Sequence, residues 1–545
     1  MCYIVKHDGI KALGYRLKRF FTRHAANHYD INTYQEWIRR YDVVSDSSRA
    51  VMKRRIQNFQ HKPLISLITA IHDPQSPWLK ECIESVQAQI YLHWELCIAV
   101  NASTGDSADF LPGQYKQQDT RIRMLFLSSK VNSAVTINSA LDIAQGEWIA
   151  LLNPEDLLSE DALFWVADVV NKKQDVALMY SDEDQLDAHG NRMKPYFKCD
   201  WNQELFYSHH MLEHLAVYRT AILREMSGFR AEFESAYSYD LALRFIERIA
   251  APQIHHIPRI LCHVRTQNPP TGASNSDSDV QMDGLRALNA HLQRRHIPAI
   301  AEPNGAYYRV RYALPDDHPL VTLIIPTRNG LQLLRQCITS IIEKTTYQNY
   351  EILIVDNNSD DAATLQYLDE LDKKGHARIL RDHRPFNYSA LNNNAVSHAH
   401  GEFVGLLNND VEVITPDWLS EMIAIAAQPG IGAVGARLWY PDDTLQHAGV
   451  ILGVGGIAAH SHKHLPRQKT DQFVRVSCTQ NLSAVTAACL IVRKSIYEQV
   501  GGLNEQDLQV AFNDVDFCLR ILEAGYRNVW TPHAELYHHE SATRG

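Results

Sequence analysis

The sequence predicts an α/β protein with two tandem domains, each built on a mostly parallel sheet, and a basic helical arm in front of them. Its 545 residues exceed what one hydrophobic core can organise, which requires at least two domains. Apolar residues form 45% and charged residues 21% of the chain, which is typical of a soluble globular protein. The third observation is that the chain repeats itself at an offset of about 256 residues.

The repeat covers three pairs of segments in the same order. They are 63–103 with 319–359, 138–158 with 393–413, and 237–244 with 513–520. In the first pair an apolar run meets a polar turn, a stretch of helical period and a second apolar run. Continuous apolar strands separated by helices are typical of parallel sheets whose two faces are covered.

We place the first domain at 62–268 and the second at 316–545. The linker between them, 269–315, begins in a loop rich in Pro, Ser, Asn and Asp. A helix near 281–295 and a short strand at 307–312 are predicted to complete it.

The arm, residues 1–61, differs from the rest of the chain in charge. Residues 1–62 carry 13 Lys or Arg against 5 Asp or Glu, a local net charge of +8. The stretch KALGYRLKRFF (11–21) places Leu and Phe near one helical face with basic residues around it. One interpretation is contact with a membrane surface or lipid carrier. The other is a helix that docks on the first domain and exposes a basic rim.

Net charge and cysteines exclude several classes of protein. A net charge of −10 argues against binding a nucleic acid backbone. Nine scattered cysteines without a CxxC pair, and no secretory signal, are typical of a reducing cytoplasm. Because no apolar run reaches about 18 residues, no membrane span is predicted. We expect a cytoplasmic protein that would lie at the cytoplasmic face of the membrane if the arm binds lipid.

Acidic residues follow two strands of the second domain. In open parallel sheets, ligands bind beyond the carboxyl ends of the strands. Asp356 follows the strand 351–355 and could accept a hydrogen bond from a nucleotide base, although turn chemistry alone would explain it. Asn408, Asn409 and Asp410 follow the strand 403–407, where Asp410 could hold Mg²⁺ or Mn²⁺ or only shape a turn.

Two further groups could complete a site. Asp514 and Asp516 open a helix, where capping explains at least one of them. Asp516 would cap or form a salt bridge, leaving Asp514 to face a cleft and take a proton from a sugar hydroxyl. His538 and His539 could finish a metal site with a neutral imidazole, or lie on the surface.

Together these segments resemble family 2 glycosyltransferases of the GT-A fold, in particular the two-domain bacterial enzymes of O-antigen, rhamnan and capsule assembly. The resemblance covers about 480 residues and implies two Rossmann-like GT-A domains. It is carried by IIPTRNG (324–330), ILIVDNNS (352–359), FNYSALNNNAV (386–396), LLNNDVEV (406–413), VTAACLIVRKS (485–495), VGGLNE (500–505), NDVDFCLR (513–520) and LYHHESATRG (536–545). YSDEDQLD (180–187), PYFKCDWN (195–202) and HLAVYR (214–219) resemble the first domain of that group.

The resemblance implies inverting transfer of a hexose or deoxyhexose from a nucleotide-diphosphate sugar to a glycan or lipid-linked oligosaccharide. Asp514 would be the catalytic base. Asp410 with His538, or less favourably His539, would bind a divalent cation, Mg²⁺ or Mn²⁺. Membrane or polysaccharide assembly machinery would be peripheral partners, and no nucleic acid is expected. The implied nucleotide-sugar-binding residues are Pro326, Thr327, Asn329, Asp356, Asn387, Asn393, Asn408, Asn409 and Asp410.

The first domain departs from the pattern at three aligned positions. Val100, Glu155 and Ser238 stand where the second domain has Asp356, Asp410 and Asp514. These losses favour a first domain that binds acceptor or serves as a scaffold, although the run Asp182-Glu183-Asp184 keeps a second active site open. The equivalents that could still act in this domain are Glu155, Asp156, Asp240 and His263.

Three alternatives remain beside a transferase with one working domain. A bifunctional transferase would use both domains, and a non-catalytic glycan-binding assembly subunit would use neither. A nucleotidyltransferase is disfavoured, because PTRNG (326–330) stands where a Gly-rich phosphate loop would be needed. The histidine-containing segment 453–469 is interpreted as a loop over the acceptor site. The resemblance also implies that relatives continue beyond the segment that ends here at Gly545.

Overall fold

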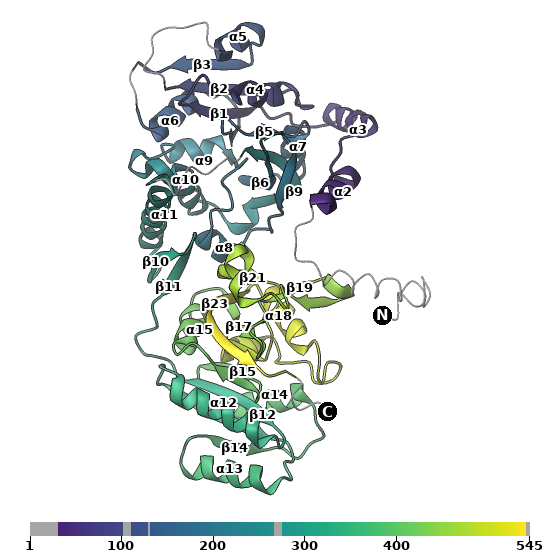
Figure 1. The fold of residues 1–545 in the computed structure, drawn as a ribbon, viewed down its shortest axis with the longest axis vertical. Helices are drawn as coiled ribbons and strands as arrows, with labels where there is room; N and C mark the ends of the chain where they lie inside the picture. Colours follow the sequence, from purple (N-terminus) through teal and green to yellow (C-terminus); the bar gives the residue numbers. More distant parts are fainter. Residues whose placement is uncertain (1–30, 102–110, 129–130, 266–274, 541–545) are drawn as a thin grey trace. The chain divides into compact units, whose positions relative to one another are not determined.

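The computed structural model describes residues 31–101, 111–128, 131–265 and 275–540 (Figure 1). They form two units: 31–202 with 210–296, here the N-terminal unit, and 203–209 with 297–540, the C-terminal unit. The predicted amphipathic stretch 11–21 lies outside the described residues.

Each unit is built on one large sheet, and the two sheets have the same strand order. In the N-terminal unit it is β3 (Ile122–Phe126), β2 (Trp94–Val100), β1 (Ile65–Ile71), β4 (Trp148–Leu151), β8 (Val217–Arg219), β6 (Leu178–Leu186), β9 (Ile254–Arg265) and β5 (Leu157–Leu158), with β7 (Arg192–Tyr196) on β6. In the C-terminal unit it is β14 (Arg378–Arg381), β13 (Tyr350–Asp356), β12 (Val321–Thr327), β15 (Phe403–Leu407), β22 (Cys489–Arg493), β17 (Ile431–Trp439), β23 (Arg527–His538) and β16 (Val411–Val413), with β18 (Leu445–His447) on β17 and β21 (Gln480–Leu482) on β23.

The predicted α/β class and tandem repeat are confirmed, but the sheets are mixed rather than mostly parallel. The strands from β14 to β15 run parallel, and β22 then runs antiparallel to both β15 and β17. The N-terminal sheet repeats this with β8 between β4 and β6. Apolar periodicity carries no information about strand direction, so the reversal could not be predicted from it.

Helices cover both faces of each sheet. In the C-terminal unit, α12 (Leu331–Lys344), α13 (Ala362–Lys373) and α15 (Trp418–Ala426) pack on one face, and α14 (Tyr388–His398), α17 (Lys494–Gln499) and α18 (Asn513–Glu523) on the other. Along β12, Leu323 and Ile325 join the first core, whereas Ile324 joins the second. Burial on both faces explains why these strands are continuous apolar runs.

The corresponding N-terminal helices are α4 (Leu79–Gln87), α6 (Ser133–Ile143), α7 (Ala162–Lys172) and α10 (Tyr237–Ile246). Besides the two helices of the arm, the unit also contains α5 (Leu111–Gln118), α9 (Thr220–Glu225) and α11 (Asn275–Arg294). Helix α8 (Gln203–Ser208), the hairpin of β10 (Ala299–Asn304) and β11 (Tyr307–Tyr312), and α16 (Val474–Ser477) belong to the C-terminal unit. The predicted linker is thus divided between the two units.

The glycine after α14 shows how closely the repeat is kept. The backbone nitrogen of Gly401 donates to Oγ1 of Thr322 at 2.9 Å, as Gly146 donates to Oγ of Ser66 at 2.8 Å. A Cβ on Gly401 would lie 2.5 Å from the backbone nitrogen of Thr322. Both positions therefore require glycine where the chain passes the first strand.

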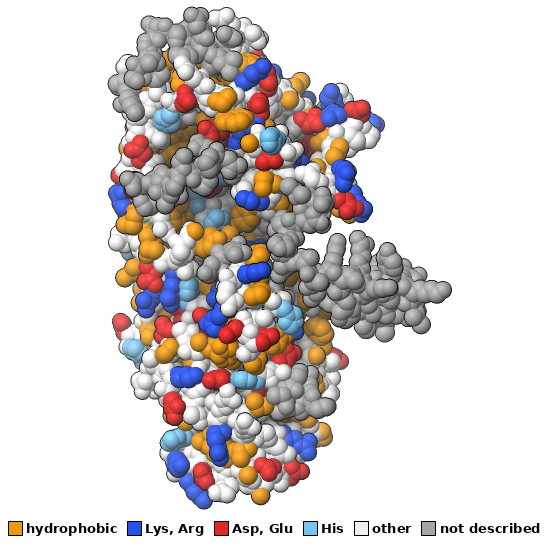
Figure 2. Space-filling model, in the orientation of Figure 1, with side chains coloured by type: hydrophobic (Ala, Val, Ile, Leu, Met, Phe, Trp, Pro, Cys, Tyr) orange, Lys and Arg blue, Asp and Glu red, His pale blue; other side chains and the backbone are white. Residues whose placement is uncertain are grey.

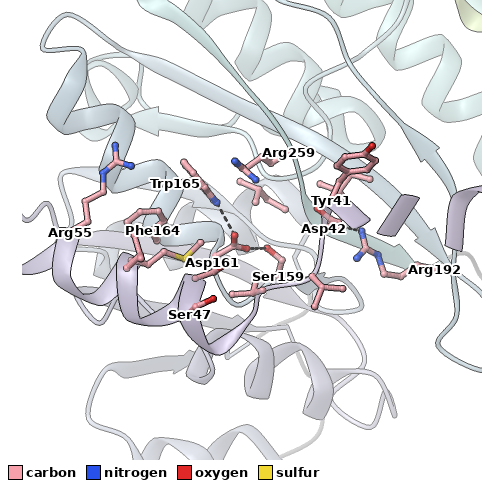
Figure 3. Close-up of a pocket in the computed structure, with 17 residues that line it drawn as sticks. Tyr41, Asp42, Ser47, Arg55, Ser159, Asp161, Phe164, Trp165, Arg192 and Arg259 are labelled. Atoms are coloured by element: carbon pink, nitrogen blue, oxygen red, sulfur yellow. Dashed lines mark hydrogen bonds and ion pairs between the residues drawn. The ribbon is translucent and has the colours of Figure 1, made fainter. Parts of the chain in front are cut away.

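The described part of the arm consists of α2 (Ile31–Tyr41) and α3 (Asp46–Gln57), which pack on the N-terminal unit. The Tyr34 hydroxyl donates to Asp184 at 2.6 Å, and Arg49 binds both carboxylate oxygens of Glu160 at 2.8 and 2.6 Å. Between these helices and β9 lies a cavity of about 390 Å³, in which Asp42 pairs with Arg192 (Figure 3). These contacts support docking for residues 31–57, and membrane contact by the arm remains a prediction.

Charged side chains of both signs are interspersed over the face drawn in Figure 2. In the part of the chain that the structure describes, no helix is both long and apolar enough to cross a membrane.

Candidate functional site

The candidate site lies at the carboxyl ends of three neighbouring parallel strands in the C-terminal unit. In register, Thr327 at the end of β12 pairs with Asp356 at the end of β13. On its other side β12 pairs with β15, which leads directly into Asn408, Asn409 and Asp410. The topology thus brings residues that are predicted to bind the nucleotide sugar to one edge of the sheet.

Asp356 is buried and both of its carboxylate oxygens have partners. Oδ1 accepts a hydrogen bond from the backbone nitrogen of Ser359 at 3.1 Å, and Oδ2 forms an ion pair with Arg381 of β14. In the N-terminal unit, Val100 pairs with Ile71 as Asp356 pairs with Thr327. The valine therefore occupies the position of the carboxylate, as the alignment predicts.

Asp410 and His538 meet at the junction of β16 and β23. Nε2 of His538 lies 3.2 Å from Oδ1 of Asp410, and both side chains are buried. Oδ1 of Asp410 receives no hydrogen bond from the described residues. A buried carboxylate oxygen without a hydrogen bond is costly unless a ligand completes its environment.

Gln446 on β18 sets the orientation of the His538 ring. Nδ1 of His538 lies 2.6 Å from the side-chain carbonyl of Gln446, so this nitrogen carries the proton as donor. Nε2 then bears the lone pair and accepts from Nδ2 of Asn408 at 3.1 Å. With the proton on Nδ1, Nε2 faces Asp410 and could bind a metal in place of its hydrogen bond from Asn408.

The ring of His539 lies elsewhere. Its Nε2 is 3.3 Å from Glu412 and 3.4 Å from Nε2 of Gln336, and only its backbone nitrogen binds Asp410, by donating to the carbonyl at 3.0 Å. The structure therefore brings His538, but not the His539 ring, to Asp410. Among the described residues, no cluster of three or more His, Cys, Asp or Glu side chains is arranged to hold a metal.

Asp514 lies in the first turn of α18 and borders a cavity of about 300 Å³. Its Oδ2 accepts a hydrogen bond from the backbone nitrogen of Ala487 at 3.1 Å. Asp516 instead binds Arg520 at 2.8 Å, and Arg520 donates to the carbonyl of Gly502 at 2.6 Å. The two acids thus divide as predicted: Asp516 fixes the helix to a neighbouring turn, and Asp514 faces the cavity.

The cavity wall also contains Tyr388 and His460, to which the sequence assigns no individual role. Tyr388 donates to the carbonyl of Ala487 at 3.2 Å, and its pKa is raised by burial and by the charges of Asp514 and Asp410. His460 lines the cavity from the segment interpreted as a loop, on the hairpin of β19 (Val450–Leu452) and β20 (Ala458–His460). Both residues fall in segments singled out above, 386–396 and 453–469, but no spacing indicates that they share a cavity, because separate elements supply them.

The remaining predicted asparagines hold the loops around the site. Nδ2 of Asn409 donates to Oγ1 of Thr327 at 3.0 Å, next to Pro326 on β12. Oδ1 of Asn329 accepts from the backbone nitrogens of Asp360 and Asp361, both at 3.0 Å.

Two of these asparagines lie on α14 and its cap, and both bind the turn at 503–505. Asn387 caps α14 and donates to the Glu505 carbonyl at 2.8 Å, and Asn393 donates to the Leu503 carbonyl at 2.8 Å. They fix the loop that precedes α18.

The predicted equivalents in the N-terminal unit separate into two groups. Asp240 is fully buried between Arg230 and Arg244, as Asp516 is bound by Arg520, and Nδ1 of His263 lies 2.6 Å from Asp184. Asp240 is thus held by two arginines, and the His263 ring is held by the Asp184 carboxylate. Glu155 and Asp156, in contrast, line a cavity of about 490 Å³.

Comparison with known proteins identifies the family of the chain. The model of the family "Glycosyl transferase family 2" matches residues 66–227 and 322–501. The uncharacterized protein y4gI of Sinorhizobium fredii is 44% identical over 94% of this chain and 57% of its own length. The O-antigen biosynthesis protein RfbC of Myxococcus xanthus is 37% identical over 90% of this chain and 38% of its own length. The chain thus spans less than two thirds of either relative.

Among solved structures, GalNAc-T7 with UDP, GalNAc and Mn²⁺ aligns with 43% of this chain and 45% of its own, at 14% identity and a TM-score of 0.36. The family match covers more than half of the chain and falls on both units. The chain belongs to glycosyl transferase family 2.

Proposed function

We propose that the C-terminal unit transfers a sugar, with inversion, from a nucleotide-diphosphate sugar to a glycan or lipid-linked glycan acceptor. The observation that carries this proposal is that Asp514 and the loop of Asp410 share one cavity. Asn408, two residues before Asp410, lines this cavity together with Asp514 and Tyr388. A base and a donor-binding loop on one cavity are what displacement at an anomeric carbon requires.

The oxygen and nitrogen atoms around Asp410 suit a divalent cation as ligands. Its buried Oδ1 lacks a hydrogen bond, and Nε2 of His538, which accepts from Asn408, lies 3.2 Å away. Mg²⁺ and Mn²⁺ accept one or two protein ligands when substrate phosphates supply the rest. A cation bound here would neutralise the charge that develops on the departing nucleoside diphosphate.

Asp514 is placed to act as the base. The hydrogen bond from Ala487 and a second one from the backbone nitrogen of Val515, at 2.9 Å, fix the direction of the carboxylate. A sugar hydroxyl in the cavity would lose its proton to Asp514 as its oxygen attacks the anomeric carbon. Attack opposite the leaving diphosphate inverts that carbon.

The cavity rim suits a carbohydrate acceptor. Phe386 and Phe512 line the cavity and are 53% and 43% exposed, so apolar ring faces are presented to solvent beside polar groups. Carbohydrates combine apolar C–H faces with hydroxyls, and such a rim can contact both.

The RfbC relative supports a role in cell-surface polysaccharide synthesis, of the O-antigen or capsule type. Transfer of a hexose or deoxyhexose, and a cytoplasmic location at the membrane face, remain part of the proposal. The alternatives are a bifunctional transferase with both units active and a non-catalytic glycan-binding assembly subunit. The Oδ1 of Asp410, which receives no hydrogen bond from the described residues, and the cavity-facing Asp514 argue against the non-catalytic alternative.

Incubation with a panel of nucleotide sugars, with and without Mn²⁺, tests the proposal. We expect release of nucleoside diphosphate from one donor, lost on chelation and restored by Mn²⁺. Asp410→Asn should remove the response to Mn²⁺. Glycan binding without turnover of any donor would support the assembly subunit instead.

A further inference from the structure

The N-terminal unit has a large cavity at the position that the candidate site occupies in the C-terminal unit. The cavity measures about 490 Å³, and its walls include Asn153, Asp156 and Ser238. The repeat aligns Asn153 with Asn408: Sγ of Cys82 contacts the Asn153 carbonyl at 3.6 Å, as Sγ of Cys337 contacts that of Asn408 at 3.8 Å. The two cavities therefore lie at the same end of equivalent sheets.

This cavity lacks the carboxylate predicted to bind the nucleotide and the carboxylate predicted to act as catalytic base. Val100 replaces the carboxylate of Asp356 in the strand register, and an alkyl side chain accepts no hydrogen bond. Ser238 stands at the position of Asp514, because Asp240 binds Arg244 as Asp516 binds Arg520. Neither replacement affects the surrounding fold, since the helix and strand that carry them are kept.

Two charged residues stand where the C-terminal unit has alanines. Leu406 pairs with Leu490, and the nitrogen of Asn408 donates to the Ala488 carbonyl. In the N-terminal unit the nitrogen of Leu151 donates to the Ala216 carbonyl, so the same register places Glu213 and His214 at the positions of Ala487 and Ala488. Both charged side chains line the cavity.

The cations of the cavity are already compensated by carboxylates outside its wall. Nδ1 of His214 lies 3.2 Å from Glu183, and Arg265 forms an ion pair with Glu81. The wall itself also carries the acids Asp73, Glu155, Asp156 and Glu213. A nucleoside diphosphate would therefore meet net negative charge without a free cation among the described wall residues.

The same wall suits a ligand that is neutral and rich in hydroxyls. Glu213 is exposed and forms no hydrogen bond or ion pair with a described residue, so its oxygens are available as acceptors. Carboxylates accept strong hydrogen bonds from hydroxyls, and Ser238 can both donate and accept. Tyr237 adds an aromatic side chain to the same wall.

We propose that the cavity of the N-terminal unit binds a neutral saccharide directly, through Glu213 and Ser238, and does not bind a nucleotide sugar. The choice of a saccharide rests on the proposed function of the C-terminal unit. A site of this kind would hold part of the growing glycan on the same chain as the transfer site. It would raise the effective concentration of the acceptor without a second reaction.

Calorimetric titration of the full chain with a set of neutral mono- and disaccharides, without nucleotide, tests this proposal. Glu213→Gln should weaken saccharide binding about tenfold, because a hydrogen bond to a charged acceptor becomes neutral. Ser238→Trp should abolish binding at this cavity by filling it. Glu234→Gln, an exposed carboxylate of the same unit outside the cavity, is the matched control and should leave binding unchanged.

Nucleoside diphosphate with Mn²⁺ is titrated into the same variants. We expect unchanged affinity in Ser238→Trp, which also shows that this variant is folded. Equal saccharide affinity in wild type, Glu213→Gln and Ser238→Trp would overturn the proposal, as would binding of no saccharide in the set. Loss of nucleotide binding in Ser238→Trp would also overturn it. Donor turnover, measured separately, reports on the C-terminal unit alone.

Discussion

Oδ2 of Asp514 accepts a hydrogen bond from the backbone nitrogen of Ala487 at 3.1 Å, which ties the first turn of α18 to the segment before β22. The carboxylate is thereby held against the wall of the 300 Å³ cavity. Two residues further along the helix, Asp516 is held by Arg520 instead. We therefore expect changes at Asp514 to affect chemistry and changes at Asp516 to affect stability.

Asp516→Ala should lower stability with little direct effect on chemistry. It removes an ion pair at 2.8 Å and releases Arg520 from its position on the Gly502 turn, at a cost of about 1–2 kcal/mol. Asp240→Ala should cost more, about 3–5 kcal/mol, because it leaves two arginines beside a fully buried gap. Urea unfolding followed by circular dichroism measures both. A stable Asp516→Ala protein without transfer would instead make Asp516 the base.

His538→Gln should weaken the Mn²⁺ dependence of donor binding, because Nε2 of His538 is the nitrogen presented to Asp410. His539→Gln is the matched control, since its ring binds Glu412. Gln446→Leu should have an intermediate effect because it releases the His538 ring, and second-sphere changes of this kind cost about 10–100-fold in metal affinity. Titration of Mn²⁺ in the presence of nucleoside diphosphate measures all three. Equal effects of the two histidine changes would contradict the assignment.

Asp356→Val copies the Val100 position of the N-terminal unit into the C-terminal one. We expect nucleotide affinity to fall about tenfold, because a charged acceptor is lost. Asp369→Asn is the control: Asp369 also contacts Arg381, at 3.3 Å, but is 61% exposed. Calorimetric titration with nucleoside diphosphates compares the two. Unchanged nucleotide affinity in Asp356→Val would show that the nucleotide base binds elsewhere.

His214 should make the N-terminal unit less stable in alkaline solution. Burial opposes its protonation, but the hydrogen bond and charge of Glu183 outweigh burial and raise the pKa of His214 to about 9. The unfolded value is about 6.5, so the stabilisation is complete below pH 6.5 and is lost as the pH rises through 9. The loss is at most about 3 kcal/mol. Urea unfolding of wild type and His214→Gln across this range should show a smaller decline in the variant, and parallel declines would contradict the assignment.

Much of the fold could be predicted, because strands that are buried on both faces of a sheet are continuous apolar runs in the sequence. The repeat then aligned Val100 with Asp356, and the strand registers of the two sheets confirm that these positions are equivalent. Strand direction could not be predicted, so the antiparallel β8 and β22 were missed.

At the site, acids that follow strands were identifiable, because strand ends share one edge of a sheet. The contact of Gln446 with His538 was not identifiable, nor was the place of Tyr388 beside Asp514 in one cavity, since separate elements bring these residues together. The adjacent His538 and His539 could be separated only by the β16–β23 pairing, which sends their rings to different partners.

The most direct test of the account is sugar transfer by Asp514→Asn, measured together with its affinity for nucleoside diphosphate and Mn²⁺. We expect transfer to fall about 10²–10⁴-fold, because the catalytic base is lost. We also expect unchanged donor affinity, since the amide keeps the size of the side chain and Asp356, Asp410 and His538 are untouched. Transfer within a few-fold of wild type would contradict the central claim that Asp514 takes the acceptor proton.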